Sequence, residues 1–259
     1  MPVWIGTSGW QYRDWRGTFY RPETSLRAWL EEYAGAFATV ESNNAFYRLP
    51  ERRTFEDWAN RTPADFVMAV KVSRYLTHIK RLSEPEEPVA RFLDRIVGLG
   101  GKLGPVLVQL PPRFRADPDR LEATLDEFPP SVRVAVEFRH PTWFSDDVRR
   151  ILTDRNVALC LADRKRPVTP VWRTADWTYL RFHEGRATPR PCYGRAALQT
   201  WAERLAAEWS PDEDCYVYFN NDPRGCAPRD AARFARLVGR AGLHPTRVPS
   251  VRAIHVAGR

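Results

Sequence analysis

Val134-Ala135-Val136-Glu137-Phe138-Arg139-His140 is a short apolar run that ends abruptly in charged residues. Its first three residues are apolar and two of them are β-branched, which is typical of a strand covered on both faces. A carboxylate at the end of such a strand is costly unless another group pairs with it. Glu137 is therefore either a functional carboxylate or half of a buried ion pair.

The same pattern, an apolar run that ends on one polar residue, recurs seven times along the chain. The copies are Ile5-Gly6-Thr7-Ser8, Val40-Glu41, Val70-Lys71, Val108-Gln109, Ala162-Asp163, Leu180-Arg181 and Phe219-Asn220. Together with the first stretch they predict eight strands. The predicted strands cover residues 3–8, 39–43, 66–72, 106–110, 133–138, 158–162, 178–182 and 215–219.

Helical patterns alternate with these strands, which predicts parallel pairing because each return crossover needs a dozen or more residues. The predicted helices cover residues 25–33 after a Ser25 cap, 51–60, 88–97, the segments that begin at 117 and 145, and then 196–208 and 229–241. Residues 164–177 contain prolines and no helical period, so the sixth helix is expected to be missing. The tail after Leu243 reads as irregular.

Eight such units in 259 residues predict an α/β fold, a (β/α)8 TIM-like barrel that forms a single domain over residues 1–259. An open doubly wound sheet is the alternative. It ranks lower because no glycine-rich phosphate loop follows any strand, and because eight polar strand ends suit one shared rim.

The composition restricts the class of protein. No apolar run is long enough to cross a membrane, and residues 1–4 do not begin a basic-then-apolar signal sequence, so no membrane association is expected. The four cysteines form no CxxC pair, so neither a disulfide nor a zinc site is expected, and Cys192 and Cys226 are interpreted as incidental. These features predict a reduced, cytoplasmic location.

The formal net charge is +8, and all but four of the 40 basic residues are arginine. A GC-rich genome produces this bias without any functional cause. The loops after the eight predicted strands nevertheless hold 22 basic and 8 acidic residues. This sorting favours an anionic ligand at the C-terminal face of the strands, with solvated loop arginines as the alternative.

Polar residues at the C-terminal ends of barrel strands usually carry catalysis or binding. We expect Glu137 and Glu41 to be the acid/base pair and Lys71 to be a fixed cation for a phosphate or a developing anion. Each of these groups could instead belong to a buried ion network, with Arg181 or Lys71 pairing the two carboxylates. The predicted substrate-binding residues are Ser8, Trp10, Asn43, Tyr47, Gln109, Arg139, Asp163, Arg181, His183 and Asn220.

No cofactor is predicted, and a divalent metal is kept as an alternative that would use Glu41, Glu137, Asp163 and His183. Lys71 and Arg181 on the same rim argue against it, since fixed cations repel a divalent ion. Of the aromatic loop residues, Trp10 and Tyr47 are the first candidates to stack on a ligand, and most of the others are expected to pack. His78 and His140 are expected to cap loops.

Spaced motifs along the chain resemble the YecE-like family, the "domain of unknown function 72" barrels. The motifs include Ile5-Gly-Thr-Ser-Gly-Trp10, Phe46-Tyr-Arg-Leu-Pro50, Gln109-Leu-Pro-Pro112 and Glu137-Phe-Arg-His140. The resemblance implies a TIM barrel with similarity to endonuclease IV-like barrels, and it implies no settled reaction. The chain departs from the family pattern at Arg21, Ala45, Glu184 and Asp230.

Three functions follow as hypotheses. The first is an enzyme that uses carboxylate acid/base chemistry on an anionic, phosphate-bearing substrate. The second is a nucleic-acid-binding protein or an endonuclease IV-like phosphodiester hydrolase. The third is a sugar or acid lyase or isomerase, in which Arg181 would bind a carboxylate. The sequence does not identify the substrate, the reaction or the oligomeric state.

Overall fold

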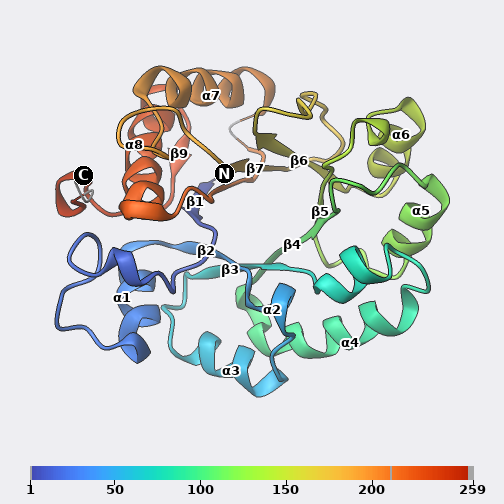
Figure 1. The fold of residues 1–259 in the computed structure, drawn as a ribbon, viewed down its shortest axis with the longest axis horizontal. Helices are drawn as coiled ribbons and strands as arrows, with labels where there is room; N and C mark the ends of the chain where they lie inside the picture. Colours follow the sequence, from blue (N-terminus) through green and yellow to red (C-terminus); the bar gives the residue numbers. More distant parts are fainter. Residues whose placement is uncertain (1, 211, 256–259) are drawn as a thin grey trace. The chain divides into compact units, whose positions relative to one another are not determined.

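The computed structural model describes residues 2–210 and 212–255 (Figure 1). All eight predicted strands are present in this part of the chain. A ninth strand, β9, lies in the tail after Leu243, which the sequence analysis interpreted as irregular. It pairs in parallel with β1. The strands are β1 (Pro2–Thr7), β2 (Thr39–Ser42), β3 (Val67–Lys71), β4 (Leu103–Gln109), β5 (Val134–Glu137), β6 (Ala158–Asp163), β7 (Thr178–Phe182), β8 (Cys215–Phe219) and β9 (His244–Pro245).

The hydrogen-bonded strand order is β2-β3-β4-β5-β6-β7-β8-β1-β9. The protein therefore has an α/β fold built on a nine-stranded sheet, in which neighbouring strands mostly follow one another in the sequence. The pairs β3–β4, β4–β5, β5–β6 and β1–β8 are parallel, as predicted. This order does not itself include a β1–β2 pair, so a closed eight-stranded barrel is not confirmed.

The described helices lie close to their predicted positions, except the one-turn helix over residues 44–47, which was not predicted. They are α1 (Trp29–Ala36), α2 (Asn44–Tyr47), α3 (Arg52–Asn60), α4 (Glu86–Ile96), α5 (Pro118–Asp126), α6 (Asp146–Asp154), α7 (Arg195–Glu208) and α8 (Cys226–Arg240). No helix lies between β6 and β7, where all residues are described, so the missing sixth helix is confirmed. Asp117 and Ser145 cap α5 and α6 through their side chains. Ser25 makes no side-chain cap, so that prediction was wrong.

The chain forms two compact units whose segments alternate along the sequence. Unit 1 comprises Met1–Glu41, Arg61–Phe66 and Leu180–Arg259, and unit 2 comprises Ser42–Asn60 and Val67–Tyr179. The single domain over residues 1–259 stays a prediction.

In unit 1, the Tyr33 hydroxyl joins β1 to β2. It accepts from the Thr7 amide at 3.0 Å and lies 3.1 Å from the Thr39 carbonyl oxygen. A Cβ at Gly6 would collide with that same carbonyl, so β1 can approach β2 this closely only with glycine at this position. The tyrosine side chain thus links the two strands.

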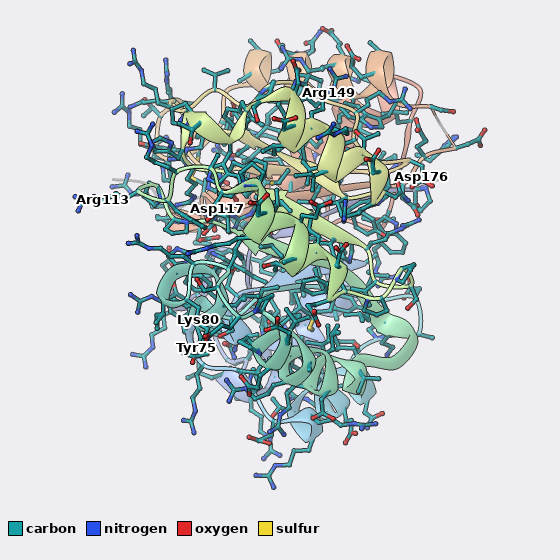
Figure 2. The ribbon with its side chains drawn as sticks, turned by 90° about the vertical axis from the view of Figure 1, so that its right-hand side faces the viewer. Tyr75, Lys80, Arg113, Asp117, Arg149 and Asp176 are labelled. Carbon is teal, nitrogen blue, oxygen red and sulfur yellow. A yellow bond between two sulfur atoms is a disulfide. The ribbon has the colours of Figure 1, made fainter. Side chains whose placement is uncertain are left out.

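In unit 2, the segment after β3 forms a one-turn π-helix, Tyr75–Ile79, which the sequence analysis did not predict. Lys80 follows it and lies over the Tyr75 ring at 5.9 Å from the ring centroid (Figure 2). His140 is a predicted loop cap, and its Nδ1 accepts from the Thr142 amide at 3.3 Å. That prediction is confirmed.

Cys192 and Cys226 form a disulfide in unit 1, with their Cα atoms 4.9 Å apart. The expectation of no disulfide, and of two incidental cysteines, was therefore wrong. The two residues are 34 positions apart in sequence, and spacing alone could not pair them. The cytoplasmic location stays a prediction, and the disulfide removes one of the arguments for it. None of the described helices is both long enough and apolar enough to cross a bilayer.

Candidate functional site

Three strand ends of unit 2 carry a continuous chain of polar side chains. Lys71 Nζ donates to Gln109 Oε1 at 2.8 Å, and Gln109 Nε2 donates to Glu137 Oε2 at 2.9 Å. Arg139 Nε donates to the other carboxylate oxygen, Glu137 Oε1, also at 2.9 Å. Gln109 lies directly opposite Glu137 in the parallel register of β4 and β5, which explains why their side chains meet. Lys71, Gln109 and Glu137 are all buried.

Further basic side chains lie close to this series of hydrogen-bonded residues. The Lys71 ammonium lies 3.9 Å from the centre of the Phe46 ring, and the His78 ring packs edge-on against the same ring. Burial, together with the nearby Lys71 and Arg139 charges, lowers the pKa of His78 to about 4, so His78 is neutral at pH 7. Burial and the Arg139 charge lower the pKa of Arg164. We call this set the Lys71 cluster: Lys71, His78, Gln109, Glu137, Arg139 and Arg164.

Unit 1 contains a second buried group around an ion pair. Arg181 Nη2 donates to Glu41 Oε1 at 2.7 Å and lies 3.4 Å from Ser8 Oγ. Arg181 is 1% exposed, and both Glu41 and Ser8 are 0% exposed. The sequence analysis offered Arg181 as a structural partner of Glu41, and the structure confirms that pairing. Glu137 forms an ion pair with Arg139, a partner that the sequence analysis had not suggested.

Tyr12 and Asp222 lie beside this ion pair. The Tyr12 hydroxyl donates to the Ser8 carbonyl oxygen at 2.6 Å and is also within hydrogen-bonding reach of Asp222. Gly9 has a φ of 110° and its Cβ position faces the Tyr12 hydroxyl, so a side chain at Gly9 would displace that ring. Trp15 Nε1 donates to the Asp222 carbonyl oxygen at 2.8 Å. We call this set the Arg181 cluster: Ser8, Tyr12, Glu41, Arg181 and Asp222.

Burial raises the pKa of the Asp222 carboxyl to about 7, and the Glu41 charge adds to this effect. The Tyr12 hydroxyl and the Arg181 charge act in the opposite direction. Burial and the Asp222 carboxylate raise the pKa of Tyr12 far above its usual value, so this phenol stays protonated. A carboxyl that is half protonated at neutral pH, next to a phenol donor, has the properties of a general acid or base.

The remaining predicted residues lie at the expected strand ends. His183 Nδ1 lies 3.2 Å from Asn220 Nδ2 in unit 1, after β7 and β8. In unit 2, Asp163 ends β6 and Asn43 directly precedes α2. Trp10 is 2% exposed whereas Tyr47 is 80% exposed, so of these two rings only Tyr47 faces solvent. The roles of all these residues stay predictions.

The four residues proposed as alternative metal ligands belong to different units. Glu41 and His183 are in unit 1, and Glu137 and Asp163 are in unit 2. Across residues 2–210 and 212–255, no group of three or more histidine, cysteine, aspartate or glutamate side chains has an arrangement that could hold a metal ion. The preference for a site without a metal stays a prediction, as does the metal alternative.

A sequence model described as "Protein of unknown function DUF72" matches residues 4–253. The chain belongs to the DUF72 family. This confirms the resemblance drawn from the sequence motifs. The UPF0759 protein YunF of Bacillus subtilis (strain 168) is 25% identical over 282 residues, which cover 94% of this chain and 98% of YunF.

Two crystal structures of DUF72 family proteins share the fold. The protein from Thermotoga maritima MSB8 is 28% identical to this chain, with a TM-score of 0.80, and the match covers 92% of this chain and 100% of that one. The protein from Enterococcus faecalis V583 is 21% identical, with a TM-score of 0.75, and the match covers 92% and 95% of the two chains.

Sequence reasoning missed Asp222 and Arg164, which no prediction named as site residues. Both directly follow residues that it did name: Asp222 lies two residues after Asn220, and Arg164 follows Asp163. Treating the first loop residues after each strand as part of the rim would have included both. The signal was present, but charged residues are so common in these loops that it did not single them out.

The raised pKa of Asp222 predicts a pH-dependent stability. Between the unfolded pKa of 3.8 and the folded pKa of about 7, the folded protein binds more protons than the unfolded chain. The stability from this group is therefore fully present below about pH 4 and is lost as pH rises through 7. In urea titrations, we expect the unfolding free energy of the parent protein to fall between pH 5 and 8. In Asp222→Asn this fall should be smaller. Parallel pH profiles for the two proteins would contradict this assignment.

Proposed function

We propose that this DUF72 protein is an enzyme that binds the phosphate of a small anionic substrate at the Lys71 cluster and uses Glu137 in acid/base chemistry. One observation carries the proposal. Arg164 Nη1 is buried and has no hydrogen-bond partner among the described residues. A buried cationic donor without an acceptor is unfavourable, and a bound anion would supply the missing acceptor.

The charges of the cluster support a phosphate group. Lys71, Arg139 and Arg164 contribute three positive charges, Glu137 contributes one negative charge, and His78 is neutral at pH 7. The surplus matches a phosphate dianion. The mutual repulsion of Arg139 and Arg164, which lowers the pKa of Arg164, would fall once an anion lies between them.

The hydrogen bonds also orient the proposed catalytic carboxylate. Lys71 donates a hydrogen bond to the side-chain carbonyl oxygen of Gln109. The NH₂ group of the same Gln109 amide must therefore face Glu137 Oε2. This bond holds the carboxylate in place from one side. Arg139, with a side chain 26% exposed, holds the other oxygen. We propose that substrate phosphate draws Arg139 away and leaves Glu137 Oε1 available to move a proton.

The location at strand ends fits this proposal, since Lys71, Gln109 and Glu137 are the last residues of β3, β4 and β5. Polar groups in this position usually form the site in parallel α/β proteins. The closed (β/α)8 barrel belongs to the same proposal, as do Glu41 and the other predicted substrate-binding residues. The phosphodiester and lyase or isomerase alternatives would use the same cationic cluster.

Inorganic phosphate is a direct probe of the Lys71 cluster. We expect Arg164→Gln to weaken phosphate binding at least tenfold in isothermal titration calorimetry, because it removes the donor that lacks a partner. Glu137→Gln should tighten binding roughly threefold or more, because it removes the one negative charge. The opposite signs exclude a general loss of structure as the cause.

Arg113→Gln is the matched control, because it removes one charge from an exposed position in the loop after β4 (Figure 2). This variant should bind phosphate as the parent does. Equal affinities for phosphate in all four proteins, or an equal loss in Arg164→Gln and Arg113→Gln, would show that the Lys71 cluster is not the site.

A further inference from the structure

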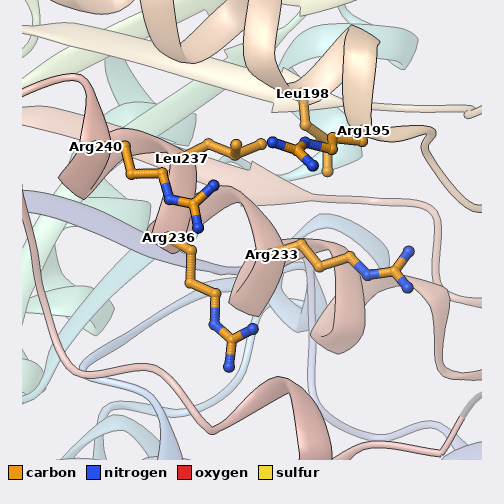
Figure 3. Close-up of a pocket in the computed structure, with 6 residues that line it drawn as sticks. All are labelled: Arg195, Leu198, Arg233, Arg236, Leu237 and Arg240. Carbon is orange, nitrogen blue, oxygen red and sulfur yellow. The ribbon is translucent and has the colours of Figure 1, made fainter.

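Unit 1 has a cationic groove along its last two helices, and none of its lining residues belongs to either cluster described above. α7 and α8 pack against each other, and a cavity of about 350 Å³ opens along their contact (Figure 3). Its volume lies in the range of small-molecule sites. We call it the arginine groove, and its lining residues are Arg195, Leu198, Arg233, Arg236, Leu237 and Arg240.

Helical spacing produces the line of charge. Arg233, Arg236 and Arg240 follow one another at three- and four-residue intervals, which places them on one face of α8 over two successive turns (Figure 3). Arg195 joins them from the first turn of α7. All four side chains are exposed. Like charges at this spacing repel one another, so a cluster of this kind is unfavourable without a counter-charge.

Little counter-charge faces these arginines among the described residues, where the charge of Asp230 acts on Arg233 without an ion pair. None of the four arginines forms an ion pair there, although arginines on other helices do, such as Arg91 with Glu87 and Arg150 with Asp147. Glu203 lines an adjoining cavity together with Arg195 and Arg240, and its Oε1 accepts from Gln199 at 2.8 Å. The described residues that line the groove itself are all arginine or leucine.

The start of α7 adds to the positive potential. Its N-cap is Gly194, which provides no side-chain hydrogen bond to the first turn. The N-terminal amides of a helix attract anions, and carboxylates usually occupy the first turn for that reason. Here the first turn contains no acidic residue and begins with Arg195. Burial and the charge of Arg229 lower the pKa of Arg233, and the charge of Asp230 opposes them.

We propose that the arginine groove binds an oligophosphate, a small anion with two or more linked phosphate groups. Three arginines spaced along about 10 Å of helix exceed what one phosphate can contact. The planar guanidinium groups suit bidentate bonds to phosphate oxygens. Leu198 and Leu237 provide an apolar floor that could cover an organic group joined to the phosphates, as in a nucleoside triphosphate. This site is independent of the function proposed for the Lys71 cluster.

Calorimetric titration with tripolyphosphate tests the proposal. We expect the triple variant Arg233→Gln, Arg236→Gln, Arg240→Gln to lose at least tenfold in affinity for tripolyphosphate. The matched control is Arg91→Gln, Arg120→Gln, Arg150→Gln, which removes the same charge from helices of unit 2 and should change the affinity less than about threefold. Arg195→Gln is the second test on α7, should the triple variant unfold in circular dichroism.

The ligands distinguish the sources of the phosphate chain. Tighter binding of ATP than of tripolyphosphate would support a nucleoside over the leucine floor, and equal binding would support the phosphate chain alone. Three results would overturn the proposal: no binding of either anion, an equal loss in the groove variant and its control, or a DNA oligonucleotide that binds the groove while tripolyphosphate fails to displace it.

Discussion

Arg181→Met should lower the free energy of unfolding by about 3–5 kcal/mol, because breaking a buried ion pair leaves the partner charge uncompensated. Arg181 lies at 1% exposure and donates to Glu41 at 2.7 Å, and Glu41 is 0% exposed. Asp222 also depends on Arg181, whose charge opposes the effect of burial on the pKa of that carboxyl. One substitution therefore affects two carboxylates, and urea denaturation monitored by tryptophan fluorescence would measure the loss.

A matched control is available on the surface of unit 2. Arg52 pairs with Glu56 at 3.1 Å on α3, and both side chains are about half exposed. Arg52→Met should change the stability by less than about 1 kcal/mol, as exposed pairs do. Adding Glu41→Gln to Arg181→Met should recover part of the loss, because it removes the uncompensated charge. A loss below 1 kcal/mol for Arg181→Met alone would refute the assigned role of the pair.

The strands could be predicted from the sequence because their signal is local. A run such as Val106-Leu107-Val108 that ends at Gln109 is apolar on both faces of a strand, which is typical of a covered parallel strand. The absence of a helix over residues 164–177 was also local, since prolines and a missing helical period exclude it.

The features that the sequence did not reveal are short or depend on distant contacts. α2 is a single turn, and β9 has two residues, so neither has enough length to show a period. β9 exists because His244 and Pro245 pair with Pro2 and Val3 at the other end of the chain. No property of residues 244–245 alone predicts that pairing.

The site shows the same division between local and distant information. Strand ends identified Lys71, Gln109 and Glu137 as candidates, but their partners depend on the register between strands. Because Gln109 lies opposite Glu137, the amide stands between Lys71 and the carboxylate, and Arg139 supplies the ion pair. The raised pKa of Asp222 depends on burial and on the charge of Glu41, 181 residues away, and no sequence pattern encodes those contacts.

Reduction of the Cys192–Cys226 disulfide should destabilise the protein by about 4 kcal/mol, from the loop-closure entropy of a 34-residue separation. For a protein of this size, that corresponds to a fall in Tm of roughly 10 °C. Thermal unfolding with and without dithiothreitol, and of Cys226→Ser without it, measures the effect. The bond joins the loop after β7 to the start of α8. Because reduction with dithiothreitol and the Cys226→Ser substitution both remove this bond, they should lower the Tm equally.

The other two cysteines are the control for this experiment. Cys160 and Cys215 are buried free thiols, so Cys160→Ser should retain its sensitivity to dithiothreitol whereas Cys226→Ser should lose it. Asp230 also fastens the same loop, since its Oδ2 accepts from the Tyr193 amide at 2.6 Å and from Asn221 at 2.9 Å. If this network alone maintained the loop, the reduced protein would keep the Tm of the oxidised one. An unchanged Tm would therefore assign the stability of the loop to Asp230 instead of the disulfide.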